Sequence, residues 1–97
     1  MFVHHVFFWL KSPVGRQALA NGLKTLEEIE PKILFHIGEP AETRREVIDS
    51  SYDFSLLIIF DNRSDQDVYQ EHPIHNKFVK QCSALWSKVV VYDSIEK

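Results

Sequence analysis

A tyrosine and two histidines surround a single proline in the segment Tyr69-Gln70-Glu71-His72-Pro73-Ile74-His75. Histidine is the side chain whose ordinary pKa lies nearest neutrality, so it can accept or donate a proton near pH 7. A tyrosine hydroxyl can donate a hydrogen bond to a substrate carbonyl. His5 offers a third imidazole from an otherwise apolar segment. These residue types predict a site that binds a polar group or transfers a proton.

His75 is the candidate general base. It begins a stripe at helical spacing that continues with Phe78, Val79 and Cys82. An imidazole among apolar side chains loses hydration, which disfavours its charged form and leaves one ring nitrogen free to accept a proton. Tyr69 is the candidate donor to a carbonyl oxygen. The structural alternative is a core histidine paired with a carbonyl or a tyrosine, and a tyrosine that only packs.

The other histidines are assigned by position. His5 lies on the strand face of Val3, Phe7 and Trp9, and we expect that face to meet the helices, so that His5 binds substrate in the cavity of His75. His4 alternates away from His5 and is expected at an interface between sheets. His72 is expected to begin a helix at Pro73, where it caps free amides, and is a second candidate for substrate binding.

A zinc site formed by His72, His75 and His5 is the alternative to an acid-base site. The i, i+3 spacing of the first two histidines is weak evidence, because a cap histidine points differently from one inside a helix. Cys82 continues the apolar stripe and is expected in the core. Gly38 has no glycine-rich phosphate loop around it. We therefore expect neither a metal nor a cofactor.

Size and charge limit the classes of protein to which the chain can belong. Its 97 residues, 44% of them hydrophobic, suit one domain spanning residues 1–97. The net charge is -3 and no basic stripe is present, which argues against nucleic-acid binding. No apolar run reaches the roughly 20 residues that span a bilayer. The single cysteine and the lack of a signal-peptide pattern predict a cytoplasmic protein.

The hydrophobic periodicities predict an α+β protein of order βαββαβ, the ferredoxin-like arrangement, in which helices cover one face of a four-stranded antiparallel sheet. The expected elements are a strand at Phe2–Leu10, a helix from Ser12 and Pro13 to before Pro31, a strand at Ile33–Ile37, a strand at Tyr52–Phe60, a short helix capped by Ser64, a helix from Pro73 to Cys82 and a strand at Val89–Tyr92. The first and third strands are apolar on both faces, so the uncovered face predicts a homodimer through the open sheet face.

Several segments together resemble the stress-responsive A/B barrel (Dabb) family over nearly the full length. They are His4-His5-Val6-Phe7-Phe8, Gly38-Glu39-Pro40-Ala41, Tyr52-Asp53-Phe54, Phe60-Asp61, the segment from Tyr69 to His75, and Phe78-Val79. The resemblance implies a dimeric α+β barrel. The family includes a plant polyketide cyclase, whose general base falls at His75, assisting tyrosine at Tyr69 and pocket histidine at His5. A second pocket tyrosine of that enzyme falls near Leu23, so this chain lacks one polar contact.

Three functions follow as hypotheses. The first is a homodimer whose small, mostly apolar pocket binds a small apolar or aromatic ligand in a stress response, without an assigned activity. The second is a cofactor-free, polyketide cyclase-like lyase in which His75 removes a proton and Tyr69 polarises the carbonyl. The third is a cofactor-free enzyme resembling quinol monooxygenases.

Overall fold

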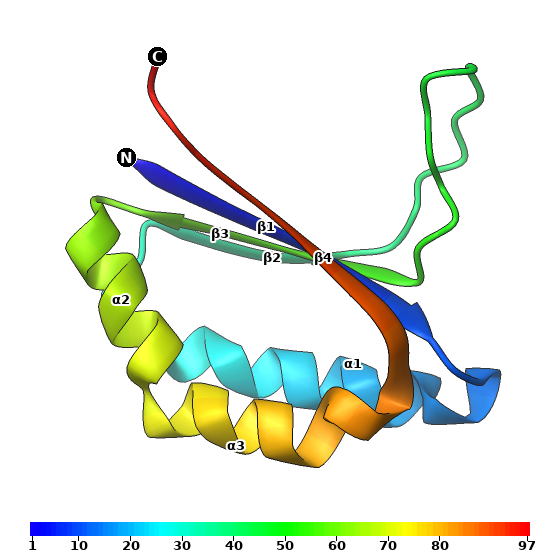
Figure 1. Ribbon diagram of the computed structural model, residues 1–97, viewed down its shortest axis with the longest axis horizontal. Helices are drawn as coiled ribbons and strands as arrows, with labels where there is room; N and C mark the ends of the chain where they lie inside the picture. The colour runs from blue at the N-terminus through cyan, green and yellow to red at the C-terminus, as the bar shows by residue number, and fades with distance from the viewer.

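A four-stranded antiparallel sheet forms one layer and helices form the other (Figure 1). The computed structural model describes residues 1–97. The strands are β1 (Phe2–Leu10), β2 (Leu34–Gly38), β3 (Phe54–Phe60) and β4 (Trp86–Ile95), in the spatial order β2-β3-β1-β4. The helices are α1 (Arg16–Thr25), α2 (Arg63–Glu71) and α3 (Pro73–Cys82), with short 3₁₀ turns at Pro13–Gly15, Leu26–Glu28 and Ser83–Leu85. The predicted ferredoxin-like α+β fold is confirmed.

Local sequence signals explain where the helices begin. The hydroxyl of Ser12 accepts a hydrogen bond from the Val14 amide, and Pro13 occupies the first position of the turn that leads into α1. The expected cap at Ser64 is wrong, because the side chain of Asn62 accepts from the amide of Asp65 and α2 begins two residues earlier. Both residue types favour an N-cap, and the asparagine lies nearer the end of β3.

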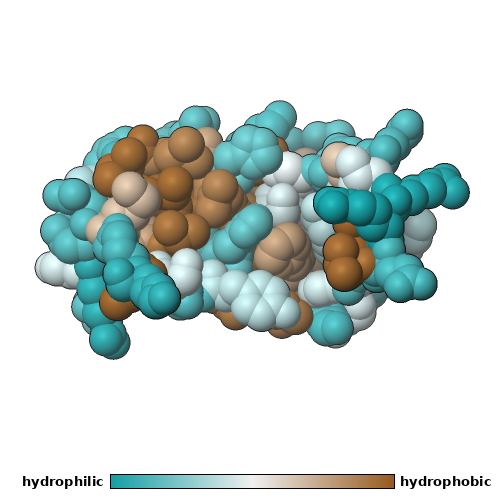
Figure 2. All heavy atoms as spheres, turned by 90° about the horizontal axis from the view of Figure 1, so that it is seen from above, coloured by the Kyte–Doolittle hydropathy of each residue, from teal (hydrophilic) through white to brown (hydrophobic).

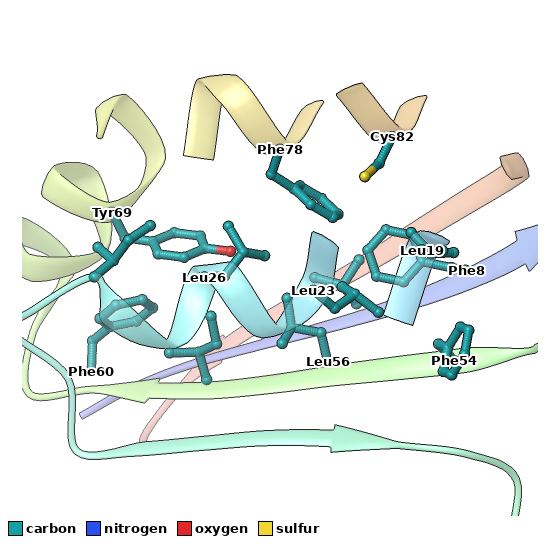
Figure 3. Packing of buried hydrophobic residues seen from close by; sticks show 13 residues of the cluster. Phe8, Leu19, Leu23, Leu26, Phe54, Leu56, Phe60, Tyr69, Phe78 and Cys82 are labelled. Atoms are coloured by element: carbon teal, nitrogen blue, oxygen red, sulfur yellow. The ribbon is translucent and has the colours of Figure 1, made fainter. Parts of the chain in front are cut away.

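The core lies between the helices and one face of the sheet (Figure 3). The even-numbered residues of β1 point into it, with His4, Val6 and Phe8 all buried. Val6 and Phe8 belong to the same hydrophobic cluster as the fully buried Leu19 and Leu23 of α1. Burying each of these leucines contributes about 1.5–3 kcal/mol. The expectation that the odd-numbered face of β1 meets the helices is therefore wrong.

The opposite face of the sheet carries no helix. The odd-numbered residues of β1 lie on it beside Leu57 and Ile59 of β3, and all are partly exposed. Figure 2 shows apolar side chains gathered over part of this face, interrupted by polar ones. The long segment 39–53 between β2 and β3 rises on the same side of the sheet (Figure 1). We call this surface the open face.

None of the helices combines the length and the apolar character that crossing a lipid bilayer requires.

Candidate acid-base and ligand-binding site

The junction of α2 and α3 sets the geometry of the segment from Tyr69 to His75. His72 adopts an extended backbone conformation (φ -65°, ψ 140°) between the two helices, and Pro73 begins α3. Nδ1 of His72 accepts a hydrogen bond from the Ile74 amide over 3.0 Å. The expected capping role of His72 is therefore present. This side chain does not line the cavity that contains Tyr69 and His75.

Tyr69 enters the core from α2. Its side chain is only 2% exposed, and its ring lies 5.5 Å from that of Phe60 and 4.9 Å from that of His75. Figure 3 shows its hydroxyl pointing into the space between helices and sheet. Burial raises the pKa of Tyr69 above its usual value. The hydroxyl therefore keeps its proton and can donate a hydrogen bond to a ligand oxygen.

His75 is half-buried at the first turn of α3 and touches the ring of Tyr69 edge to face. Burial, and then the neighbouring His4, lower the pKa of His75, so the neutral ring dominates near pH 7. Its Nδ1 atom is buried and has no hydrogen-bond partner. Its Nε2 atom lies 3.4 Å from Nε2 of Gln70. A neutral imidazole with a reachable nitrogen meets the first requirement for a general base.

His4, rather than His5, is the strand histidine of this site. It is 6% exposed, and its ring lies 5.7 Å from that of Tyr69. The Nδ1–H group of His4 donates to Oδ1 of Asp93 on β4 over 2.6 Å. Because a carboxylate accepts at Nδ1, the neutral His4 ring is left with Nε2 as its free acceptor. The assignment of His4 to an interface between sheets is wrong.

His5 lies on the open face, separated from His75 by the sheet. Its ring stacks beside Phe7 at 4.4 Å. Burial lowers the pKa of His5, and the nearby His36 and His4 lower it further. Successive side chains of a strand point to opposite faces, so His5 must face away from the helices because His4 faces them. His5 and His75 therefore do not share the cavity.

A cavity of about 280 Å³ lies between α3 and the β1–β4 half of the sheet. Nine of its thirteen lining residues are hydrophobic, so an apolar ligand body fits the walls. The lining residues are His4, Val6, Phe8, Leu56, Tyr69, Gln70, His75, Phe78, Val79, Trp86, Val89, Val91 and Asp93. Val89 and Val91 are 41% and 47% exposed, which places the open side of the cavity along β4.

Sequence reasoning missed Asp93, Gln70 and Trp86 as lining residues. Asp93 pairs with His4 across the antiparallel β1–β4 ladder. A signal for Asp93 exists in the sequence, because Val89, Val91 and Asp93 form one alternating face of the last strand. That face predicts an apolar wall that ends in a carboxylate.

The structure brings no three histidine, cysteine or acidic side chains together in a geometry that would hold a metal ion. In particular, the three histidines of the alternative zinc site do not converge, since His72 caps α3 and His5 occupies the other face of the sheet.

The model of the stress responsive A/B barrel domain matches residues 2–96. The chain belongs to this family. Among curated proteins, no sequence matches the chain significantly. The shared architecture of this A/B barrel domain does not assign a reaction.

Three solved structures are similar to this A/B barrel domain over nearly its whole length. A Dabb family protein with a ferredoxin-like fold from Mesorhizobium loti is 22% identical, with 99% of this chain and 96% of that chain covered and a TM-score of 0.80. A dimeric ferredoxin-like protein of unknown function from Jannaschia sp. is 16% identical, with 98% of both chains covered and a TM-score of 0.80. The hydroxynitrile lyase of Passiflora edulis is 19% identical, with 99% of this chain and 93% of that chain covered and a TM-score of 0.79. At these identities the similarity establishes the fold.

Proposed function

We propose that this protein is a homodimer in which each protomer binds a small organic molecule in the cavity between α3 and the sheet. The ligand would have an apolar or aromatic body and one carbonyl or hydroxyl group. The observation that carries this proposal is the convergence of three polar side chains, those of His4, Tyr69 and His75, in a cavity whose walls are otherwise mostly apolar. Apolar walls with a few placed polar groups are typical of small-molecule sites.

The size of the cavity restricts the ligand. A volume of about 280 Å³ lies just below the range of about 300–1,000 Å³ that is typical of sites for drug-sized molecules. We therefore expect a ligand built around one ring or a short chain. The hydroxyl of Tyr69 would donate to its oxygen, and the histidines would accept from a hydroxyl or an acidic C–H group.

Two observations support the homodimer. The open face carries partly exposed apolar side chains on neighbouring strands, and such a patch is typical of an interface. Proteins of the same fold are dimeric, including that from Jannaschia sp.. The sheet would then separate the dimer interface from the two cavities, which lie on the helix side of each protomer.

A second candidate function is proton transfer by a cofactor-free lyase or cyclase. The lowered pKa of His75 favours it, because a neutral imidazole can take a proton from a carbon next to a carbonyl group. The electron pair of the broken C–H bond would form an enolate, and the Tyr69 hydroxyl would stabilise its oxygen. A lyase with this fold, the hydroxynitrile lyase of Passiflora edulis, is consistent with such chemistry.

A ligand screen with matched variants tests both candidates. Ring-sized ketones, phenols and hydroxy-ketones would be screened by calorimetry and thermal stabilisation. Tyr69→Phe, which removes one donor, should weaken binding of a hit about tenfold, and His75→Ala by a similar factor. His72→Asn is the control: asparagine also caps helices, so affinity should not change. Equal affinities of all variants for every hit would contradict the proposed site.

The same samples separate binding from catalysis. Exchange of the proton next to the carbonyl for solvent deuterium, followed by NMR, would identify a proton-transfer enzyme, and loss of this exchange in His75→Ala would assign the base. Binding without exchange would leave a binding protein. Oxygen consumption with a hydroquinone would instead favour the monooxygenase-like alternative.

A further inference from the structure

The side-chain amides of two glutamines on α2 connect to His75 by hydrogen bonds. Gln66 and Gln70 lie one turn apart, and Nε2 of Gln66 donates to Oε1 of Gln70 over 3.0 Å. Nε2 of Gln70 in turn lies 3.4 Å from Nε2 of His75. Gln66 is only 8% exposed, whereas Gln70 and His75 both line the cavity. The amides thus connect a buried position on α2 with the candidate base.

The direction of these hydrogen bonds determines where His75 carries its proton. An amide nitrogen donates hydrogen bonds and does not accept them. Because Gln70 turns its oxygen towards Gln66, it turns its nitrogen towards His75. With this amide orientation Nε2 of His75 is the acceptor, which would place the proton of the neutral ring on the buried Nδ1, an atom without a hydrogen-bond partner.

We propose that Gln70 is a positioning residue, which keeps Nε2 of His75 unprotonated, and that Gln66 fixes the orientation of the Gln70 amide. The buried Nδ1 atom of His75 is closed to a ligand, whereas Nε2 lies next to Gln70, which also lines the cavity. Nε2 is thus the nitrogen that can take a proton in the cavity. The role in proton transfer depends on the proposed function, but the tautomer belongs to the unliganded protein.

The side-chain amides of Gln66 and Gln70 can also form hydrogen bonds that suit the protonated ring of His75. When Nε2 takes a proton from a ligand, the ring becomes a donor at both nitrogens. Turning both amides over then presents Oε1 of Gln70 to Nε2–H, while Nε2 of Gln70 donates to Oε1 of Gln66. No other group has to move, so Gln70 can form a hydrogen bond with His75 before and after the transfer.

The ¹⁵N resonances of the two ring nitrogens of His75 test this proposal, because an unprotonated ring nitrogen resonates far downfield of a protonated one. In the unliganded protein at mildly alkaline pH, we expect Nε2 to be the unprotonated nitrogen. In Gln70→Glu, a carboxylate replaces the amide donor, so the tautomer should invert and the pKa of His75 should rise. In Gln70→Leu, the tautomer ratio should shift towards Nε2–H by about tenfold.

A matched control is available on α1, where Nε2 of Gln17 donates to Oδ1 of Asn21 over 2.9 Å in an exposed pair with the same spacing. Gln17→Glu and Gln17→Leu should leave the His75 resonances unchanged. Protonated Nε2 in the unsubstituted protein, or an unchanged tautomer in both Gln70 variants, would overturn the proposal. Because these spectra need no ligand, a negative result for the role of Gln70 can be told apart from a negative result in the ligand screen.

Discussion

The two histidines of the cavity differ in their partners. His4 is held by the carboxylate of Asp93, which fixes its proton on Nδ1. His75 has no charged partner: its Nδ1 atom has none at all, and its Nε2 atom faces an amide. The carboxylate of Asp93 fixes the orientation of His4, which suits His4 to orienting a ligand. His75 is the candidate base because its ring is neutral near pH 7 and lines the cavity.

The pKa of His75 predicts how stability depends on pH. Burial lowers this pKa from 6.5, so in mildly acidic solution the folded protein binds fewer protons than the unfolded chain. The resulting stability is fully present above pH 6.5 and is lost as the pH falls towards the folded-state value. His75→Asn should therefore reduce the loss of unfolding free energy between neutral and acidic pH. One pKa unit corresponds to about 1.4 kcal/mol, and partial exposure reduces the effect.

Urea unfolding of both proteins at a series of pH values measures this difference. His5 titrates in the same direction and remains in both proteins, so some decline should persist in the variant. Identical pH slopes of the unfolding free energy in the two proteins would contradict the prediction.

The sequence predicted the place of His75 correctly, but it selected the wrong histidine of β1. Helical spacing relates His75 to Phe78, so one buried residue fixes the direction in which the other points. In β1 both faces are apolar, so alternation cannot tell which face meets the helices. The sequence therefore placed a histidine of β1 in the cavity but selected His5 instead of His4. If the direction of one side chain in a strand is assigned wrongly, every other side chain of that strand is assigned to the wrong face as well.

At the scale of elements, α1 and α3 approach closely at Gly22. A Cβ atom at this position would collide with the sulfur of Cys82 and would lie 3.3 Å from the ring of Phe78. The glycine costs about 1 kcal/mol of helix propensity relative to alanine. It is therefore required for the contact between the helices, and α3 in turn forms a wall of the cavity.

Gly22→Ala should lower the free energy of unfolding by about 1–3 kcal/mol, because the added methyl group overpacks the contact with Cys82. In a Cys82→Ala background the sulfur is gone and only the tight contact with the ring of Phe78 remains, so Gly22→Ala should be clearly less destabilising than in the unsubstituted protein. Urea unfolding of the four proteins in this double-mutant cycle measures the coupling. Additive effects would show that the close contact is not the reason for the glycine.

The sequence predicted the bounds of α3 correctly but made the last strand too short. The expected helix from Pro73 to Cys82 agrees with α3 because proline and the apolar stripe mark its start and course. The last strand is longer than the expected Val89–Tyr92 and runs from Trp86 to Ile95. Its outer positions include Lys88 and Asp93, which have low strand propensity, and pairing with β1 extends the strand through them.

At the scale of the molecule, the open face predicts association. Leu57 lies near its centre, paired with His5 on one side and His36 on the other. In Leu57→Glu, each protomer would bring a carboxylate into the dimer interface beside His5 and His36, and the desolvation of this carboxylate opposes association. Because Leu57 points away from the helices, the fold should persist. We expect the variant to be a monomer at micromolar concentration in sedimentation velocity experiments.

Val68→Glu provides the matched control, because Val68 is 47% exposed on α2, on the other side of the sheet. This variant should remain a dimer. A monomeric unsubstituted protein, or a Leu57→Glu variant that sediments as a dimer, would show that the open face is not the interface.

The cavity opens along β4 on the helix side, whereas the second copy would cover the other side of the sheet. In such a dimer the sheet of each protomer would lie between its cavity and the partner, so the entrance along β4 would stay on the helix side. Ligands would therefore enter and leave without dissociation of the subunits. Since each cavity is walled by its own helices, occupancy of one site has no direct route to the other, and the saturation curve of the dimer should be hyperbolic rather than cooperative.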